Sequence, residues 1–140
     1  QLILFFIMFL VALFLNPMSI LVFDFSHLYF SFTLLAASLY MASTMIWSHQ
    51  IVHYLQMGHF DKTVFAVGIA LSLFFVFLLR TQLMVTPEQW LRRMITHHST
   101  ALTTTTQLLK NNNVDDKTYR LAKDILLVQQ QEIDFMKSLL

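Results

Sequence analysis

The sequence predicts an all-α membrane protein in which three transmembrane helices precede a C-terminal antiparallel helical hairpin. Of its 140 residues, 56% are hydrophobic and 12% are charged, against about 25% charged in a typical soluble domain. Two glycines and two prolines allow few turns, which favours long helices over many short strands. We expect a transmembrane region over residues 1–85 and a hairpin domain over residues 86–140.

The first predicted span covers about residues 2–23. Its apolar run ends at Asn16-Pro17 and resumes as "MSILVFDF", so either the residues after Pro17 or residues upstream of Gln1 must supply the roughly 20 residues that a span needs. Because Gln1 already lies in an apolar run, we expect the native chain to start upstream. A signal-peptide core is the alternative, but no small-residue cleavage site follows closely, and we favour a membrane anchor.

The second and third predicted spans cover about residues 28–47 and 63–80. Neither contains an internal charge, as a helix in contact with lipid requires. Aromatic residues that suit membrane interfaces lie near the predicted boundaries: Tyr29, Trp47, Tyr54 and Trp90. With three spans, the loop between the first two lies on the same side of the membrane as the hairpin. The loop between the second and third spans lies on the opposite side.

The hairpin is predicted from two amphipathic patterns and the turn between them. In "TPEQW", Thr86 can cap a helix, Pro87 suits its first position and Gln89 completes a capping box. Apolar residues then recur at helical spacing up to Leu109. "KNNNVDD" supplies turn-forming asparagines and a new aspartate cap, and a second helix extends to the end of the chain. Two helices alone bury little core, so we expect a homo-oligomer or docking to other membrane or assembly proteins.

Met94, His97 and His98 form the candidate metal site, because their spacing places a thioether and an imidazole on one helical face. Pairing around a loop near Asn112 sets residue 98 opposite about residue 126, and residue 94 opposite about residue 130. Gln129, Glu132 and Met136 then face the first turns of the preceding helix. The chain has no cysteine. Imidazole and thioether together suit Cu(I) or Ag(I) better than magnesium or calcium.

These residues carry a family resemblance. "QWLRRMITHHSTALTTTTQLL…LAKDILLVQQQEIDFMKSLL" resembles the membrane-anchored branch of a small helical family of formerly unknown function that includes the CopM-type periplasmic copper-binding proteins. The family pattern is M-I-P-H-H followed by a distant Q-x-x-E-I-x-x-M, and Thr96 stands where proline is usual. The matching positions are Met94, Ile95, His97, His98, Gln129, Glu132, Ile133 and Met136. The resemblance implies a ferritin-like helical fold, of which the hairpin is half, and copper binding.

A structural role for the same residues is the competing interpretation. The two histidines would hydrogen-bond to Glu132 and Gln129 and fix the hairpin's register, and a methionine at helical spacing is usually core. Even at a metal site, we expect Glu132, with Gln129, to orient a histidine rather than to ligate the metal. The predicted topology lets Asp24 and His27 approach the histidine pair.

A second pattern repeats methionine and histidine every four residues: Met41, Met45, His49, His53 and Met57. Such a series shares a helical face, with a drift of about 40° per step. It either passes a soft cation along the helix or, more commonly, forms a packing seam with histidines at the headgroups. The predicted topology places His49, His53 and His59 on the side opposite the hairpin.

Enzyme and nucleic-acid functions are not expected. A di-iron site would need several carboxylates with Glu-x-x-His repeats, and the hairpin offers only Glu132 at a suitable position. No nucleophile has a base and an orienting group, and a net charge of +1 gives no electrostatic footprint for nucleic acid.

We therefore expect a multi-pass membrane protein whose hairpin binds copper or silver, or alternatively a structural subunit without metal. Arg80, Arg92 and Arg93 favour a cytoplasmic hairpin whereas the resemblance favours the outside, so its side is left open.

Overall fold

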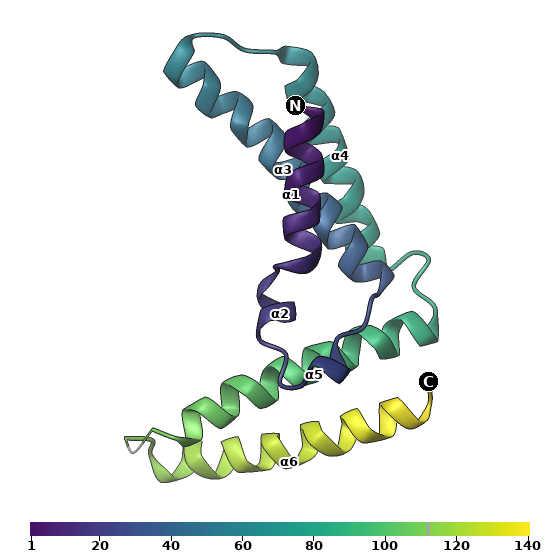
Figure 1. Ribbon diagram of the computed structural model, residues 1–140, viewed down its shortest axis with the longest axis vertical. Coiled ribbons are helices and arrows are strands. Elements are labelled where there is room, and N and C mark those ends of the chain that lie inside the picture. The colour runs from purple at the N-terminus through teal and green to yellow at the C-terminus, as the bar shows by residue number, and fades with distance from the viewer. Residues whose placement is uncertain (112) are drawn as a thin grey trace. The chain divides into compact units, whose positions relative to one another are not determined.

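The computed structural model describes residues 1–111 and 113–140, and these residues form helices and connections without any strand (Figure 1). This confirms the all-α class. The chain divides into two compact units: residues 1–16 with 32–85 form unit 1, and residues 17–31 with 86–140 form unit 2. Residues 17–31 are thus packed with the hairpin, although they precede most of unit 1 in the sequence.

Unit 1 consists of α1 (Leu2–Phe14), α3 (Phe32–Met57) and α4 (Lys62–Thr81), with α1 and α4 both packed against α3. The helix expected over 63–80 matches α4. The span expected over 28–47 overlaps α3, which starts later, at Phe32, and continues ten residues past Trp47, to Met57. Polar side chains after Trp47 end the apolar run but not the helix, which stops only at Gly58, where φ is +69° and glycine carries no steric penalty.

The segment expected as one span over residues 2–23 is divided at Pro17. The helix α1 ends at Phe14, where the Asn16 side-chain amide donates to the Leu13 carbonyl at 3.1 Å. A short helix α2 (Pro17–Ile20) follows, with proline at its first position. Proline has no N–H to donate to a preceding turn, and its ring disfavours helical geometry at the residue before it. The sequence is mainly apolar on both sides of Asn16-Pro17, yet one helix ends and a new one starts here.

Two segments of the described chain, Leu2–Ile20 and Lys62–Thr81, are long and apolar enough to cross a membrane. The helix α3 is not among them, because hydroxyl, amide and imidazole side chains interrupt its apolar sequence. Several of these polar residues are buried in unit 1: Ser38, Ser43 and Gln50. Three transmembrane helices are therefore not established.

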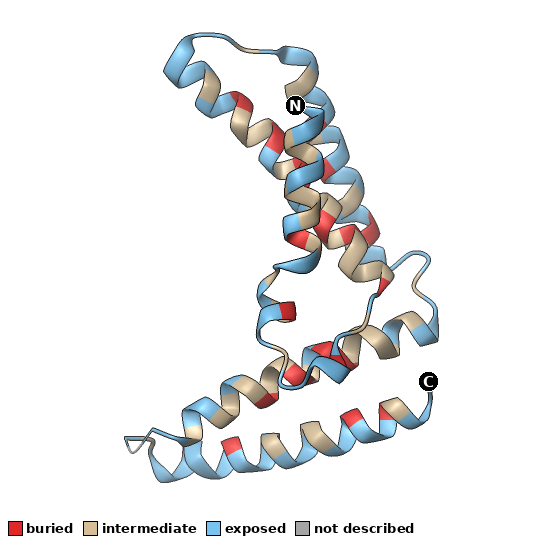
Figure 2. Ribbon diagram, viewed as in Figure 1, coloured by how far each residue is buried: buried red, intermediate tan, exposed pale blue. Residues whose placement is uncertain are grey.

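Small residues let α3 and α4 approach closely, and buried positions recur along α3 in Figure 2. A Cβ added to Gly68 would lie 3.1 Å from the Cβ of Trp47 and 3.2 Å from its backbone nitrogen. One turn later, the Trp47 indole N–H donates to the Ser72 hydroxyl at 3.2 Å, and that hydroxyl donates to the Gly68 carbonyl at 2.8 Å. Close backbone approach through glycine and serine is typical of helices packed in membranes.

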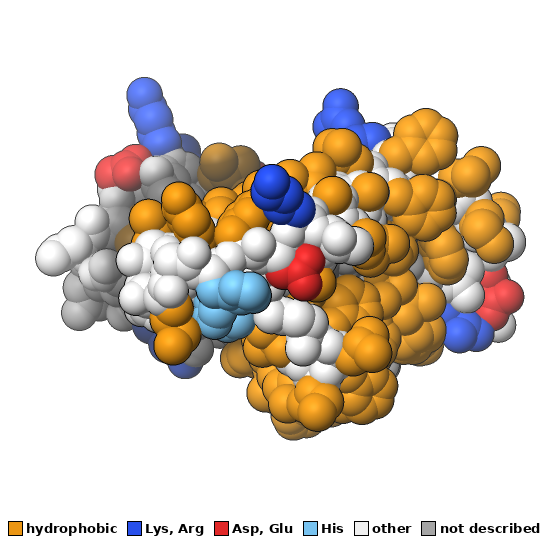
Figure 3. All heavy atoms as spheres, turned by 90° about the horizontal axis from the view of Figure 1, so that it is seen from above, with side chains coloured by type: hydrophobic (Ala, Val, Ile, Leu, Met, Phe, Trp, Pro, Cys, Tyr) orange, Lys and Arg blue, Asp and Glu red, His pale blue; other side chains and the backbone are white. Residues whose placement is uncertain are grey.

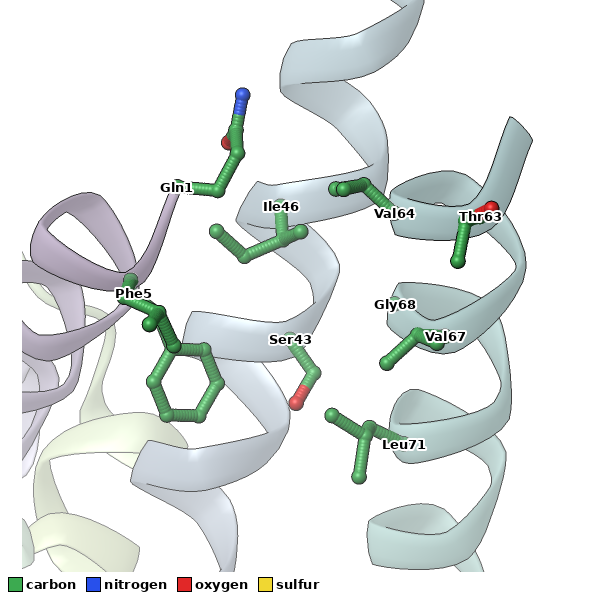
Figure 4. Close-up of a pocket in the computed structure, with 10 residues that line it drawn as sticks. Gln1, Phe5, Ser43, Ile46, Thr63, Val64, Val67, Gly68 and Leu71 are labelled. Carbon is green, nitrogen blue, oxygen red and sulfur yellow. The ribbon is translucent and has the colours of Figure 1, made fainter. Parts of the chain in front are cut away.

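An open cavity of about 310 Å³ lies among the three helices of unit 1. Phe5, Ile46 and Leu71 point into it from α1, α3 and α4 (Figure 4). Its lining contains no Asp, Glu, His, Lys or Arg side chain. The cavity is therefore lined mainly by apolar side chains.

Unit 2 is built around the hairpin of α5 (Pro87–Leu109) and α6 (Asp116–Ser138). The Thr86 hydroxyl accepts from the Gln89 amide at 3.3 Å, and the Asp115 carboxylate accepts from the amides of Lys117 and Thr118, both at 3.1 Å. Both helices thus start at the caps expected from the sequence. The core between them consists of Ile95, Leu102, Ile133 and Met136.

The strap, residues 21–31, crosses α5 through buried hydroxyls, with the 3₁₀ helix η1 (Phe25–His27) at its centre. The Ser99 hydroxyl accepts from the Phe23 amide at 2.8 Å and lies 3.0 Å from His27 Nδ1. The Thr96 hydroxyl donates to the His27 carbonyl at 2.8 Å and accepts from the Tyr29 amide at 3.3 Å. These contacts hold the strap to the hairpin.

Candidate functional site

His98 uses both ring nitrogens to join α5 to α6. Its Nδ1 lies 2.9 Å from the Met94 carbonyl oxygen, and its Nε2 lies 2.9 Å from Glu132 Oε2. A carbonyl only accepts hydrogen bonds, so Nδ1 carries a proton. The ring is thus oriented by α5, and its outer nitrogen is directed at α6.

His97 is the exposed member of the pair, and its ring centroid lies 5.9 Å from that of His98. Partial burial lowers the pKa of His97, with smaller contributions from the positive charges of His98 and Arg93. Arg93 is itself turned inward, with Nη2 2.7 Å from the Met18 sulfur of α2. These surroundings favour a neutral His97 ring, which has a lone pair that a metal ion could use.

The two methionines of the predicted site are core residues. Met136 is 6% exposed within the cluster of Ile95, Leu102 and Ile133, and Met94 packs against the same cluster. Gln129, one turn before Glu132, is half-buried on α6. The sequence pattern thus places one imidazole–carboxylate pair in contact, with the two thioethers in the core of the same hairpin.

The pairing across the hairpin differs in level from the expected one, because His98 reaches Glu132 rather than residue 126. Helical side chains lean toward the N-terminus of their own helix. In an antiparallel pair, this lean carries His98 toward the level of Met94 and carries Glu132 back toward the loop. The expected pairing was counted from residue positions around residue 112 and did not include the lean of the side chains. Residue 112 itself lies outside the described residues.

Asp24 and His27 do not join the histidine pair through any hydrogen bond of the described residues. Asp24 accepts from the Ser26 amide at 2.7 Å and caps η1; these hydrogen bonds lower its pKa. His27 is 6% exposed and contacts Ser99, the residue after His98. The strap does reach α5, as expected. Its Asp24 and His27 side chains, however, contact Ser26 and Ser99 rather than the histidine pair.

Sequence reasoning missed the roles of Thr96 and Ser99. Thr96 was noted only as a departure from a family proline, and Ser99 was not singled out. Both are buried within an amphipathic helix, at 4% and 0% exposure. Ser99 lies four residues after Ile95 and three before Leu102, so a small polar residue within the apolar spacing was the available signal that another segment covers α5.

Among the described residues, no three His, Asp or Glu side chains are arranged to hold a metal ion. An open groove of about 560 Å³ along the hairpin is lined by residues such as Phe23, Leu102, Lys123 and Asp124, and it includes neither His97 nor His98. The candidate site is therefore a surface pair rather than an enclosed centre. Figure 3 shows one face of the molecule, where hydrophobic side chains cover much of the surface and histidine side chains also reach it.

The comparisons with known proteins agree with the small helical family expected from the sequence. A family described as a domain of unknown function, DUF305, matches residues 79–140. An uncharacterized protein, L153, of Acanthamoeba polyphaga mimivirus is 31% identical over 104 residues, which cover 72% of this chain and 68% of the relative. No solved structure matches the chain. The chain belongs to the DUF305 family, with residues 79–140 as its family domain.

Proposed function

We propose that this chain is a membrane-anchored metal-binding protein whose hairpin binds a soft or borderline metal ion, copper in particular, through His97 and His98. The observation that carries the proposal is the orientation of His98. Its Nδ1–H donates to the Met94 carbonyl, which leaves Nε2, 2.9 Å from Glu132 Oε2, as the nitrogen that could bind a metal ion. Histidines that ligate metals characteristically donate their other ring N–H to a carbonyl or carboxylate, which fixes the tautomer.

Glu132 occupies the nitrogen of His98 that a metal ion would use. A metal ion at Nε2 would displace the hydrogen bond between His98 and Glu132, so metal binding and this contact across the hairpin compete. The exposed His97 ring is the second nitrogen donor. Met94 and Met136 are ligands only if they leave the core, so the imidazoles bind first.

Copper is the preferred ion because imidazole nitrogens suit it and because the M-I-x-H-H pattern resembles copper-binding members of the family. The same resemblance supports a ferritin-like arrangement. The hairpin supplies two of the four helices that such a bundle needs. A second copy of the chain would supply the others.

The membrane anchor rests on unit 1. Two apolar segments are long enough to span a bilayer, and many large apolar side chains of unit 1 are exposed, such as Leu2, Leu73 and Phe77. We include α3 as the third span, with its buried hydroxyls satisfied by its own carbonyls: Ser38 donates to Leu34 at 2.8 Å and Ser43 to Leu39 at 2.7 Å. Such bonds make hydroxyls tolerable in lipid.

The test is a Cu(I) titration of the detergent-purified full chain in the presence of a competing chelator. The His97→Ala/His98→Ala variant is expected to lose stoichiometric binding. The Thr104→Ala/Gln107→Ala variant, altered at two exposed positions of the same helix, is expected to retain it. Equal affinities of the wild type and the histidine variant would refute the metal function.

A second candidate function, structural assembly, is favoured by an exposed apolar stripe on α6. The stripe follows the 4-3 spacing of a helix–helix interface, with Glu132 at the position between Val128 and Phe135. Its apolar members are 37–65% exposed: Leu121, Ile125, Val128, Phe135 and Leu139. In this case the His98–Glu132 contact only fixes the hairpin. Light scattering together with the Cu(I) titration separates the two functions. The Leu121→Glu/Ile125→Glu variant, altered in the part of the stripe away from Glu132, is expected to lose the oligomer, and under the metal function it keeps its Cu(I) affinity per chain.

A further inference from the structure

Unit 1 carries a cluster of three histidines at the connection between α3 and α4. His49 and His53 lie one turn apart on α3, with ring centroids 6.0 Å apart and planes inclined by 32°. His59 follows in the connection, and its ring centroid lies 5.7 Å from that of His53. The methionine–histidine repeat of the sequence includes the first two; the fold adds His59.

The His53 ring is held by a hydrogen bond that leaves its other nitrogen available. Its Nδ1 lies 3.1 Å from the His59 carbonyl oxygen, and because a carbonyl only accepts, Nδ1 carries the proton. In the neutral ring, Nε2 then holds a lone pair. This is the arrangement in which histidine commonly ligates a metal ion, with Nδ1–H bonded to a backbone carbonyl.

His49 provides an independent indication. Its Nδ1 is buried and has no hydrogen-bond partner among the described residues. Buried polar atoms are nearly always paired, and one left unpaired calls for an explanation. A metal ion shared with His53 would use a nitrogen of this ring, since histidines at i and i+4 on a helix can chelate one ion.

The position of His59 is fixed by the residues on either side of it. Gln50, 2% exposed, accepts a hydrogen bond from the Asp61 amide at 3.3 Å. The Phe60 ring packs between Tyr54 of α3 and Phe65 of α4, with centroid distances of 5.8 Å and 5.0 Å. The Asp61 carboxylate caps α4. The connection is therefore anchored to both helices, and His59 is kept beside His53.

The geometry points to a second metal site, in which His49, His53 and His59 bind a divalent transition metal ion of the Zn²⁺ or Cu²⁺ class. Three imidazoles without thiolate or thioether are a borderline set that suits these ions. The rings do not yet converge on one point, so His49 and His59 rotate about their side-chain bonds when the ion binds. The site lies wholly within unit 1 and does not depend on the hairpin pair.

The experiment is a Zn²⁺ titration of the detergent-purified full chain against a chromophoric chelator, in a background that carries His97→Gln and His98→Gln. In this background the result does not depend on the function proposed for the hairpin. We expect one Zn²⁺ per chain, and we expect His53→Gln to weaken binding by about tenfold or more, since the loss of even an outer-shell partner of a metal ligand costs about 10–100-fold in affinity. His59→Gln is expected to weaken it as well.

A rearranged variant controls for histidine content and folding. His53→Gln/Leu55→His keeps the number of histidines but moves one off the shared face, to a position that is 76% exposed. Its affinity is expected to match that of His53→Gln, and its helix content by circular dichroism that of the background protein. If either His53→Gln or the rearranged variant bound Zn²⁺ as tightly as the background protein does, the proposal would be overturned. It would also be overturned if the background protein bound no stoichiometric Zn²⁺.

Discussion

The two units of this chain are packed by opposite means. In unit 1 the closest contacts between helices involve glycine and serine, and the larger side chains point outward, as Leu73 does at 66% exposure. In unit 2 large side chains fill the interior, with Ile95 and Ile133 at 0% exposure. Burial of large apolar groups gains free energy only where water is the alternative. The contrast is what a lipid-facing unit and a water-facing unit would show.

The largest expected change in stability comes from removing a core side chain of unit 2, which tests whether large buried side chains stabilise this unit. Ile133→Ala deletes a fully buried side chain and is expected to cost about 2–5 kcal/mol of unfolding free energy, since the cavity adds to the lost transfer term. Urea unfolding of the detergent-purified chain, followed by circular dichroism, measures the change. Leu127→Ala, at a position 61% exposed, is the control and is expected to cost far less. Equal costs would mean that the interior of unit 2 is not its main source of stability.

In unit 1 the expected damage comes from adding volume rather than removing it. Gly68→Leu places its Cβ 3.1 Å from the Trp47 Cβ, and overpacking of this kind costs about 1–3 kcal/mol. Ala70→Leu adds the same side chain at an exposed position of α4 and should be neutral. Thermal unfolding in detergent compares the two variants. If Gly68→Leu were as stable as Ala70→Leu, close approach of α3 and α4 would not be what holds unit 1 together.

The strap gives a smaller effect that is specific to unit 2. Ser99→Ala removes the hydroxyl that accepts from the Phe23 amide and is expected to cost about 1 kcal/mol, because water can partly replace the bond. Hydrogen exchange of residues 22–29 should accelerate while exchange in α6 changes little. Thr104→Ala, exposed on the same helix, should leave the strap protected. Acceleration throughout unit 2 would indicate that the strap and the hairpin unfold as one.

The smallest expected effect is a pH dependence of the strap. Burial lowers the pKa of His27 from its ordinary 6.5, with Lys137 lowering it further and Asp24 and Asp134 opposing. The released strap therefore binds a proton more readily than the attached strap. The stabilisation by His27 is complete above about pH 6.5 and is lost as the pH falls below that value. Hydrogen exchange of the strap at several pH values, corrected for intrinsic rates, should show this loss in the wild type and not in His27→Gln.

Local patterns in the sequence predicted much of this structure, and contacts across the chain set the rest. The caps at Thr86 and Asp115 and the two helices of the hairpin follow from short-range rules, and the structure confirms them. The membrane span expected up to Trp47 stops ten residues before the end of α3, because hydropathy indicates where apolar side chains stop, whereas the helix itself ends only at Gly58. The approach of the strap to α5 was expected from the topology, but its hydrogen bonds were not, because Phe23 and Ser99 are 76 residues apart in the sequence. The metal-binding role of His97 and His98 stays a prediction.

The assignment of residues 17–31 to unit 2 has a consequence for how the protein can be cut. Because this segment is inserted between two parts of unit 1, the backbone passes between the units three times: after Asn16, after Ser31 and after Val85. A protease that severed only the Val85–Thr86 bond would leave the hairpin held by the strap, through the hydroxyls of Thr96 and Ser99. Release of the hairpin as a separate fragment would require that this non-covalent attachment also fail. Residues 86–140 are therefore not a complete packing unit in this protein, and their expression alone would leave the strap-binding face of α5 uncovered.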